Sequence, residues 1–139
     1  MEKCIILVAE DDADDRFLLQ TAFEEVGGDE QLRFTENGVE LIEYLDGLGE
    51  TPFHGFILLD LNMPKKDGRE VLKHLKQHTR YKRIPVIIFS TTKNELEVLR
   101  CYELGANTYI RKPVNYDSLI KVVEDMRKYW LNHALIAAS

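Results

Sequence analysis

The sequence predicts a doubly wound α/β fold, in which a central five-stranded parallel sheet is covered by helices on both faces. Segments with strand-like and helix-like patterns alternate five times along the 139 residues, and this alternation is typical of a parallel sheet with crossover helices. The segments 56–59 and 86–89 are uninterrupted apolar runs, as expected of strands buried on both faces. Charged or hydroxyl-bearing residues follow several of the strands, at the edge where open α/β sheets bind ligands.

The first half of the chain shows clear boundaries for its elements. The apolar segment 4–9 predicts a buried strand. Asp14 and Asp15 favour a helix start after it, because they can cap the first turn and face the positive end of the helix dipole. We expect this helix to end at Gly27-Gly28. Residues 32–35 alternate between apolar and polar side chains, which indicates a strand near a sheet edge.

The second half repeats this design. Pro64 cannot continue the strand before it, and turn residues follow. Pro85 opens the next strand, and Gly105 ends the helix that follows it. Asn115 is a favourable N-cap for the final helix. In chain order we expect strands at 4–9, 32–35, 56–59, 86–89 and 108–110, and helices at about 14–26, 39–48, 68–78, 94–104 and from 116 onward.

Length and composition limit the class of protein. A chain of 139 residues is expected to form one domain. Its net charge of −6 disfavours nucleic acid or an anionic membrane as the main partner. The apolar runs are too short to span a membrane, and no signal-peptide cleavage pattern follows Met1, so we expect a cytoplasmic protein. Cys4 and Cys101 lack Cys-x-x-Cys spacing, so neither a disulfide nor a zinc site is indicated. Both are expected to be buried thiols.

The residues that follow the strands carry the chemistry. Acidic residues 10–12 follow the first strand, Asp60 the third, Ser90 the fourth and Lys112 the fifth. Parallel strands bring these residues to one edge, where clustered carboxylates repel one another unless a cation is present. Mg²⁺ suits hard oxygen ligands and keeps positions for water or phosphate oxygens. Lysine and serine can bind phosphoryl oxygens, so the sequence predicts a magnesium and phosphate site.

The motifs at these strand ends resemble those of a receiver domain of a two-component response regulator, from Lys3 to about Leu131. A narrower resemblance is to the small single-domain regulators of phytochrome-type and other hybrid histidine kinases. The implied fold is the flavodoxin-like (βα)5 sandwich, with 1–139 as the receiver domain and 132–139 as an extension of the last helix or a tail. The matching motifs are Ile-Leu-Val-Ala-Glu10-Asp11-Asp12, Leu-Leu-Asp60-Leu-Asn-Met-Pro64-x-x-Asp-Gly68, Pro85-Val-Ile-Ile-Phe-Ser90 and Gly105-Ala-Asn-Thr-Tyr109-Ile-Arg-Lys112-Pro113, and for the narrower resemblance Asp60-Leu-Asn-Met-Pro-Lys-Lys-Asp-Gly-Arg-Glu and Tyr81-Lys-Arg-Ile-Pro.

This resemblance implies a phosphoacceptor and a metal site. Asp60 would attack the phosphohistidine of a kinase and form an aspartyl phosphate, so the chain would be a signalling phosphoacceptor and not an enzyme beyond its own phosphorylation and dephosphorylation. The acidic pair that holds Mg²⁺ could be Glu10-Asp11 or Asp11-Asp12, and alignment on the preceding strand favours the first. Asp60 and the backbone carbonyl of Asn62 would complete the protein ligands.

The resemblance also implies a switch. Lys112 would pair with the phosphoryl group, and a cis bond would precede Pro113, since X-Pro bonds alone adopt that form readily. Ser90 and Tyr109 would form the switch pair, in which the hydroxyl moves to the phosphoryl oxygen and the aromatic ring moves inward behind it.

The expected partners are a histidine kinase or a histidine phosphotransfer protein. We expect no effector domain after the last helix, and therefore output through a protein contact, or relay or storage of the phosphoryl group. The favoured contact is a homodimer through the fourth helix, the fifth strand and the final helix, whose apolar stripe runs to Trp130 and continues at Leu131, Leu135 and Ile136. The alternative is a tail that packs back over the core.

Three other classes fit less well. A haloacid-dehalogenase-like phosphatase, the aspartate-nucleophile alternative, needs a second acid two residues after its nucleophile, where this chain has Asn62. A flavodoxin-like cofactor binder would need hydroxyl and glycine donors after the first strand, where acids would repel a cofactor phosphate. A degenerate receiver that serves only as a docking module is disfavoured by the complete set of Asp11, Asp60, Ser90 and Lys112.

Overall fold

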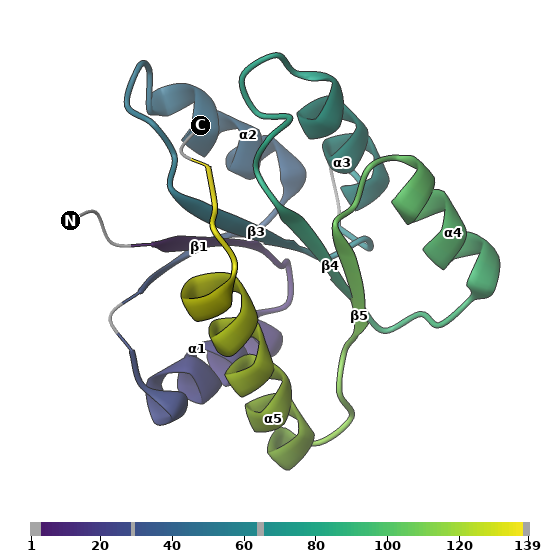
Figure 1. Ribbon diagram of the computed structural model, residues 1–139. Coiled ribbons are helices and arrows are strands. Elements are labelled where there is room, and N and C mark those ends of the chain that lie inside the picture. The colour runs from purple at the N-terminus through teal and green to yellow at the C-terminus, as the bar shows by residue number, and fades with distance from the viewer. Residues whose placement is uncertain (1–3, 29, 64–65, 138–139) are drawn as a thin grey trace.

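The computed structural model describes residues 4–28, 30–63 and 66–137. Lys3, where the resemblance begins, and Pro64, expected to end a strand, lie outside the described residues. Strands and helices alternate from the first strand to the last helix (Figure 1). The elements are β1 (Ile5–Ala9), α1 (Ala13–Val26), β2 (Gln31–Thr35), α2 (Gly38–Gly47), β3 (Gly55–Leu59), α3 (Gly68–Gln77), β4 (Val86–Ser90), α4 (Glu95–Glu103), β5 (Thr108–Arg111), α5 (Tyr116–Met126) and η1 (Arg127–His133).

The five strands form one parallel sheet in the order β2-β1-β3-β4-β5. The predicted doubly wound fold is therefore confirmed, and so is the edge position of the strand at 32–35. The chain reverses its direction of winding between β1 and β3. In folds of this class the ligand site lies beside such a switch point, at the carboxyl ends of the strands.

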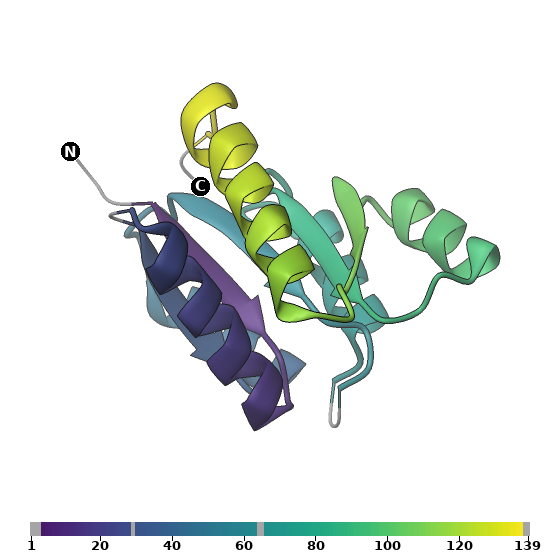
Figure 2. The same cartoon turned by 90° about the horizontal axis from the view of Figure 1, so that it is seen from below.

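The sheet separates two apolar layers. Alternate side chains of each central strand point to opposite faces, so Leu58 packs with α1 and α5 while Leu59 packs with α2 and α3. Figures 1 and 2 show α1 and α5 together on one face and α2 and α3 on the other. Both layers bury β3 completely, because its uninterrupted apolar sequence leaves no polar side chain to face water.

The start of α1 differs from the sequence prediction. Its cap is Asp12, whose side chain accepts a hydrogen bond from the backbone N–H of Asp15 (3.0 Å). Asp14 and Asp15 lie in the first turn instead, where they face the positive end of the helix dipole. The predicted helix end is confirmed by the C-cap at Gly27, which has φ 86°, a conformation that glycine adopts without steric cost.

The final helix widens after Met126 into the π-helical segment η1. The Trp130 ring lies 6.0 Å from the Phe56 ring, and Leu131 and Ile136 pack partly buried against the α1–α5 layer. These three side chains therefore cover the protein's own core, as the tail interpretation expected, and do not form an exposed seam. Only Leu135 of the predicted apolar extension is fully exposed.

Two further sequence expectations can be compared with the structure. Cys101 is a buried free thiol, as expected, whereas Cys4 is only half-buried because it lies just before β1 begins. Among the described helices, none combines the length and the apolar character needed to cross a membrane.

Candidate functional site

The predicted acidic residues meet at the carboxyl edge of the sheet. Asp60 follows β3 and is 6% exposed, and Glu10 follows β1 and is 4% exposed. Asp11 is exposed beside them, and one carboxylate oxygen of each of the three residues lies within 4.8 Å of the other two. The structure therefore brings Glu10, Asp11 and Asp60 into one cluster with two buried members.

Backbone hydrogen bonds extend the sheet by one residue past the strands and fix these side chains. The N–H of Asp60 donates to the carbonyl of Ala9 (3.1 Å). The N–H of Lys112 likewise donates to the carbonyl of Ser90 (2.8 Å). Because these residues still follow the ladder, the direction of each side chain is set by the pleat of its strand.

Lys112 provides the positive charge of the site. Its Nζ lies 3.5 Å from Asp60 Oδ2 and 3.2 Å from Asp15 Oδ2, and it also pairs with Glu10 Oε1. Sequence reasoning missed Asp15 as a member of this group, although its place in the first helical turn after the acidic run puts it near the same edge. Lys112 thus contacts three carboxylates from three different elements.

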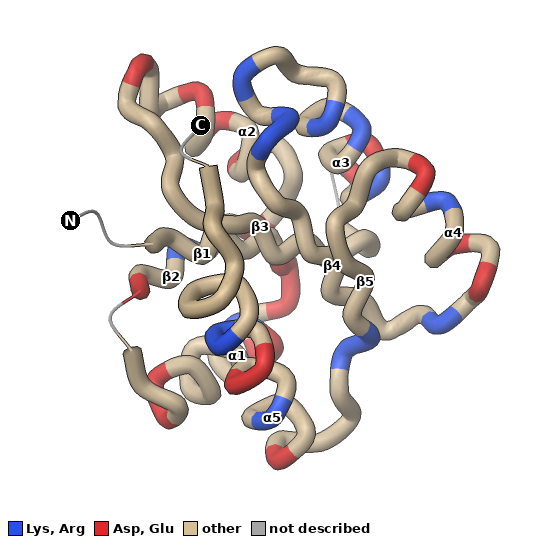
Figure 3. Tube along the Cα trace, viewed as in Figure 1, with Lys and Arg blue, Asp and Glu red and all other residues tan. Residues whose placement is uncertain are grey.

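The ionisable groups of the site alter one another's pKa values. Burial is the main reason that the pKa of Glu10 is raised to about 7; Lys112 opposes this shift and the Asp60 carboxylate adds to it. Burial alone would lower the pKa of Lys112, but hydrogen bonding and attraction from the surrounding carboxylates outweigh it, so the pKa of Lys112 is raised. One lysine therefore does not offset the negative charge gathered at this edge. By contrast, basic residues gather along α3 and the segment before β4 (Figure 3).

The geometry distinguishes between the two acidic pairs. Asp12 is engaged as the cap of α1, whereas Glu10 and Asp11 lie in the cluster with Asp60. The arrangement favours Glu10-Asp11 as the pair. Asn62 is exposed at the start of the loop after β3, and its backbone N–H donates to Asp60 Oδ1 (3.3 Å).

Ser90 and Tyr109 lie on the neighbouring strands β4 and β5. Ser90 is fully buried, and within the described ranges its Oγ has no hydrogen-bond partner. A buried hydroxyl without a partner is rare and marks a place where a further polar group can bind. This orphaned hydroxyl fits the phosphoryl oxygen that the sequence assigns to it.

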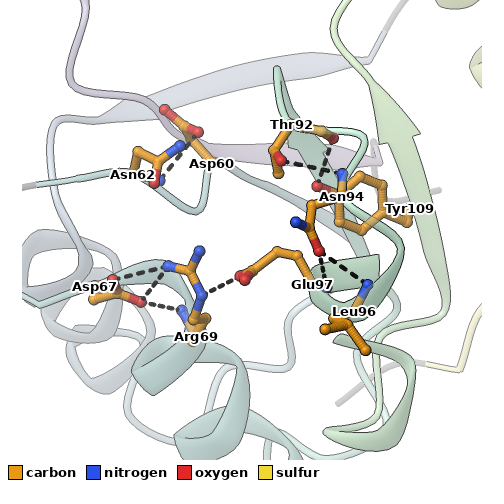
Figure 4. Close-up of polar contacts among 9 residues, drawn as sticks. All are labelled: Asp60, Asn62, Asp67, Arg69, Thr92, Asn94, Leu96, Glu97 and Tyr109. Carbon is orange, nitrogen blue, oxygen red and sulfur yellow. Dashed lines mark hydrogen bonds and ion pairs between the residues drawn. The ribbon is translucent and has the colours of Figure 1, made fainter. Parts of the chain in front are cut away.

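The half-buried Tyr109 ring is tied to the loop that follows β4. Its hydroxyl donates to the carbonyl of Thr92 (2.9 Å; Figure 4). Burial is the main reason that the pKa of Tyr109 is raised. Thr92 was not identified from the sequence, because a backbone acceptor leaves no signal in residue type.

The expected cis bond before Pro113 is wrong, because the Lys112–Pro113 peptide is trans. The trans form is intrinsically favoured by about 0.5–1 kcal/mol even before proline. Here Lys112 reaches its carboxylate partners with the trans bond in place.

Comparisons with known proteins show which family the chain resembles in sequence and in fold. The family described as "Response regulator receiver domain" matches residues 6–124. Response regulator Rcp1 of Synechocystis sp. is 38% identical over 138 residues, which cover 97% of this chain and 94% of Rcp1. The crystal structure of the Mn(2+)-bound form of Rcp1 has a TM-score of 0.87 over 97% of this chain and 99% of that one.

Two other solved structures are similar over nearly the whole chain. The phosphorylated cyanobacterial phytochrome response regulator RcpA is 36% identical, with a TM-score of 0.88 over 97% of this chain and 99% of RcpA. RPA3017, a response regulator in red light signaling of R. palustris, is 30% identical, with a TM-score of 0.90 over 98% of this chain and 99% of RPA3017. The narrower resemblance to regulators of phytochrome-type kinases is thereby confirmed. The chain belongs to the response regulator receiver domain family and is a response regulator of two-component signalling.

Proposed function

We propose that Asp60 accepts a phosphoryl group from a phosphohistidine of a histidine kinase or histidine phosphotransfer protein. The observation that carries this proposal is the position of the buried Asp60 carboxylate, which lies beside Glu10 and Asp11 and 3.5 Å from the Lys112 ammonium. The likeness to the phytochrome response regulator RcpA supports a phytochrome-type kinase as the donor.

The proposed reaction needs little covalent work from the protein. An Asp60 carboxylate oxygen forms a bond to phosphorus while the bond from phosphorus to the histidine nitrogen breaks, and the nitrogen keeps the electron pair. Lys112 offsets charge on the phosphoryl oxygens, and the unpartnered Ser90 hydroxyl donates to one of them. In this way the chain catalyses its own modification.

The acidic cluster fits a divalent cation, for which we propose Mg²⁺. Glu10, Asp11 and Asp60 provide carboxylate oxygens within 4.8 Å of one another, and we assign the Asn62 backbone carbonyl as a further ligand. Such hard oxygen donors suit Mg²⁺, which keeps several coordination positions for water or phosphate oxygens. When bound, the cation would neutralise charge on the transferring phosphoryl group. The Mn(2+)-bound form of the similar protein Rcp1 supports binding of a divalent ion.

Incubation with acetyl phosphate and Mg²⁺ tests the proposed function. We expect intact-mass spectrometry to show one added phosphoryl group, which hydroxylamine removes because it cleaves acyl phosphates. Omission of the metal or its chelation should prevent labelling. An unmodified mass, or a label that resists hydroxylamine, would contradict the proposal.

The surface around the phosphoacceptor suits an amphipathic protein partner. Phe17, Leu18 and Val114 are exposed large apolar residues near the site, from α1 and the loop before α5. A cavity of about 120 Å³ reaches Asp60 and Lys112 from this surface and is lined mainly by apolar side chains. Exposed acids after β1 and in the first turn of α1 surround these residues. We assign this surface to the phosphodonor protein, with apolar and basic side chains on its contact face.

We further propose that the chain forms a homodimer through α4, β5 and α5. Leu96 and Leu99 of α4 are 76% and 55% exposed. β5 lies at the edge of the sheet, and a groove between β5 and the final helix is lined by Ile110, Val122 and the exposed Tyr129. Clustered apolar side chains of this kind usually mark a contact surface.

Sedimentation should show that a stable phosphoryl mimic, beryllium fluoride with Mg²⁺, tightens self-association by about tenfold, or about 1.4 kcal/mol. Leu99→Asp should abolish this self-association, because it would bury a charge in the dimer interface. Phe17→Asp makes the same change at an exposed residue of α1, which is not part of the proposed contact surface, so it is the matched control and should dimerise normally. A monomer with and without the mimic up to about 100 μM, a weak-affinity regime, would refute the dimer.

A further inference from the structure

Helix α4 has few contacts that hold it to the rest of the molecule. Cys101 is its only buried residue, and its outer face carries exposed apolar residues including Leu96 and Leu99. The helix projects from the side of the molecule next to β5 (Figures 1 and 2). A helix that buries so little surface depends on polar contacts for its position, and elements with few buried contacts are those that move most readily.

One such contact joins α4 to α3. The Arg69 guanidinium pairs through Nε with Glu97 Oε1 in the first turn of α4, and Nη1 of Arg69 lies 3.0 Å from Asp67 Oδ2 (Figure 4). Burial alone would lower the pKa of Arg69, but Glu97 and Asp67 outweigh this effect and raise it. Arg69 is thus a single cation shared between the N-cap of α3 and the first turn of α4.

The α3 end of this contact is attached to the phosphoacceptor strand. The N–H of Gly68 donates to the carbonyl of Leu61 (3.1 Å). A Cβ added at Gly68 would lie 2.6 Å from Leu61 Cα and would also meet the backbone oxygen of Asp60. The start of α3 therefore packs directly on the backbone of Asp60 and Leu61, and a shift of that backbone must displace Arg69.

The first turn of α4 also has a second, separate connection. Asn94 caps the helix by accepting from the N–H groups of Leu96 (3.0 Å) and Glu97 (3.2 Å). The N–H of Asn94 in turn donates to Thr92 Oγ1 (3.2 Å), and Thr92 receives the Tyr109 hydroxyl at its carbonyl. This connection passes through Tyr109, whereas the Arg69 connection does not.

We propose that Arg69 is a positioning residue whose ion pair with Glu97 couples the phosphoacceptor loop to α4, in parallel with the Ser90 and Tyr109 route. The proposal rests on the proposed function of Asp60. Movement of the Asp60 and Leu61 backbone on phosphorylation is transmitted through Gly68 and Arg69 to the first turn of α4, and hence to the exposed apolar face of that helix. Without the ion pair, α4 responds through the Tyr109 route alone.

Hydrogen exchange of the full chain, with and without beryllium fluoride and Mg²⁺ and at a protein concentration at which sedimentation shows a monomer, tests this coupling. In the wild type we expect the mimic to change the exchange of amides in residues 92–104. In Arg69→Gln and in Glu97→Gln this change should fall about threefold or more, a size typical of coupling contacts. The Arg69→Gln/Glu97→Gln double variant should lose no more than either single variant, because both remove the same contact.

Arg100→Gln is the matched control, because Arg100 is exposed on α4 and pairs with no carboxylate in the described part of the chain. It should keep the wild-type response. Binding of the mimic, measured by the shift in melting temperature that it causes, should persist in all variants. This measurement distinguishes loss of the coupling from loss of the phosphoryl site. A full α4 response in both single variants, or additive losses in the double variant, overturns the coupling alone. A wild-type chain that does not bind the mimic overturns the proposed function, and the coupling with it.

Discussion

Asp60→Asn is expected to abolish phosphorylation completely and to leave the fold intact. Asp60 follows the fully buried central strand β3 and lies beside Glu10, Asp11 and Lys112. Asparagine has nearly the same size and can still accept the backbone N–H of Asn62, but its amide cannot form an acyl phosphate. The substitution also removes one of several carboxylates that repel one another, so we expect stability without metal to be unchanged or slightly higher.

Labelling with acetyl phosphate and Mg²⁺, followed by intact mass and peptide mapping, measures this effect. Asp14→Asn is the matched control, because Asp14 is an exposed acid on the first turn of α1. This control should be labelled like the wild type. A hydroxylamine-sensitive phosphoryl group on the Asp60→Asn variant would show that another carboxylate is the acceptor.

The fold and the acidic edge follow from local sequence patterns. The apolar runs 56–59 and 86–89 are buried strands because no polar side chain interrupts them. Since the strands are parallel, the residues that follow them meet at one edge, which places Asp60 beside Glu10 and Lys112. These inferences need only the order of the strands and helices and the spacing of apolar residues within each of them.

Contacts between distant side chains could not be predicted in the same way. Asp15 and Lys112 are 97 positions apart, and the pairing of Arg69 with Glu97 depends on how α4 sits beside α3. The cap of α1 could have been any of several neighbouring aspartates, and the backbone geometry of the turn selects Asp12. Such details are set by tertiary packing, which residue type alone does not encode.

Millimolar Mg²⁺ is expected to raise the melting temperature of the wild type. A ligand that binds only the native state at about ten times its Kd adds about 1.4 kcal/mol, which corresponds to about 3–6 °C for a domain of this size. The raised pKa of Glu10 also predicts that a bound cation stabilises the fold. A carboxyl whose folded pKa is raised from 4.5 to about 7 contributes stability at low pH that is lost as the pH rises to about 7. A bound cation offsets that loss at neutral pH.

Asp11→Ala should remove the metal-induced shift while the variant still folds, because Asp11 is exposed and its loss leaves no buried group unpaired. Asp14→Ala changes the charge equally on the adjacent exposed turn and should keep the full shift. Thermal unfolding at neutral pH, with and without Mg²⁺, distinguishes site binding from general screening, since screening would act on both variants alike. A wild-type melting temperature indifferent to millimolar Mg²⁺ would show that the acidic cluster is not a metal site. An equal shift in both variants would show that Asp11 is not a ligand, because a bound ion held by Asp11 must lose affinity when that carboxylate is removed.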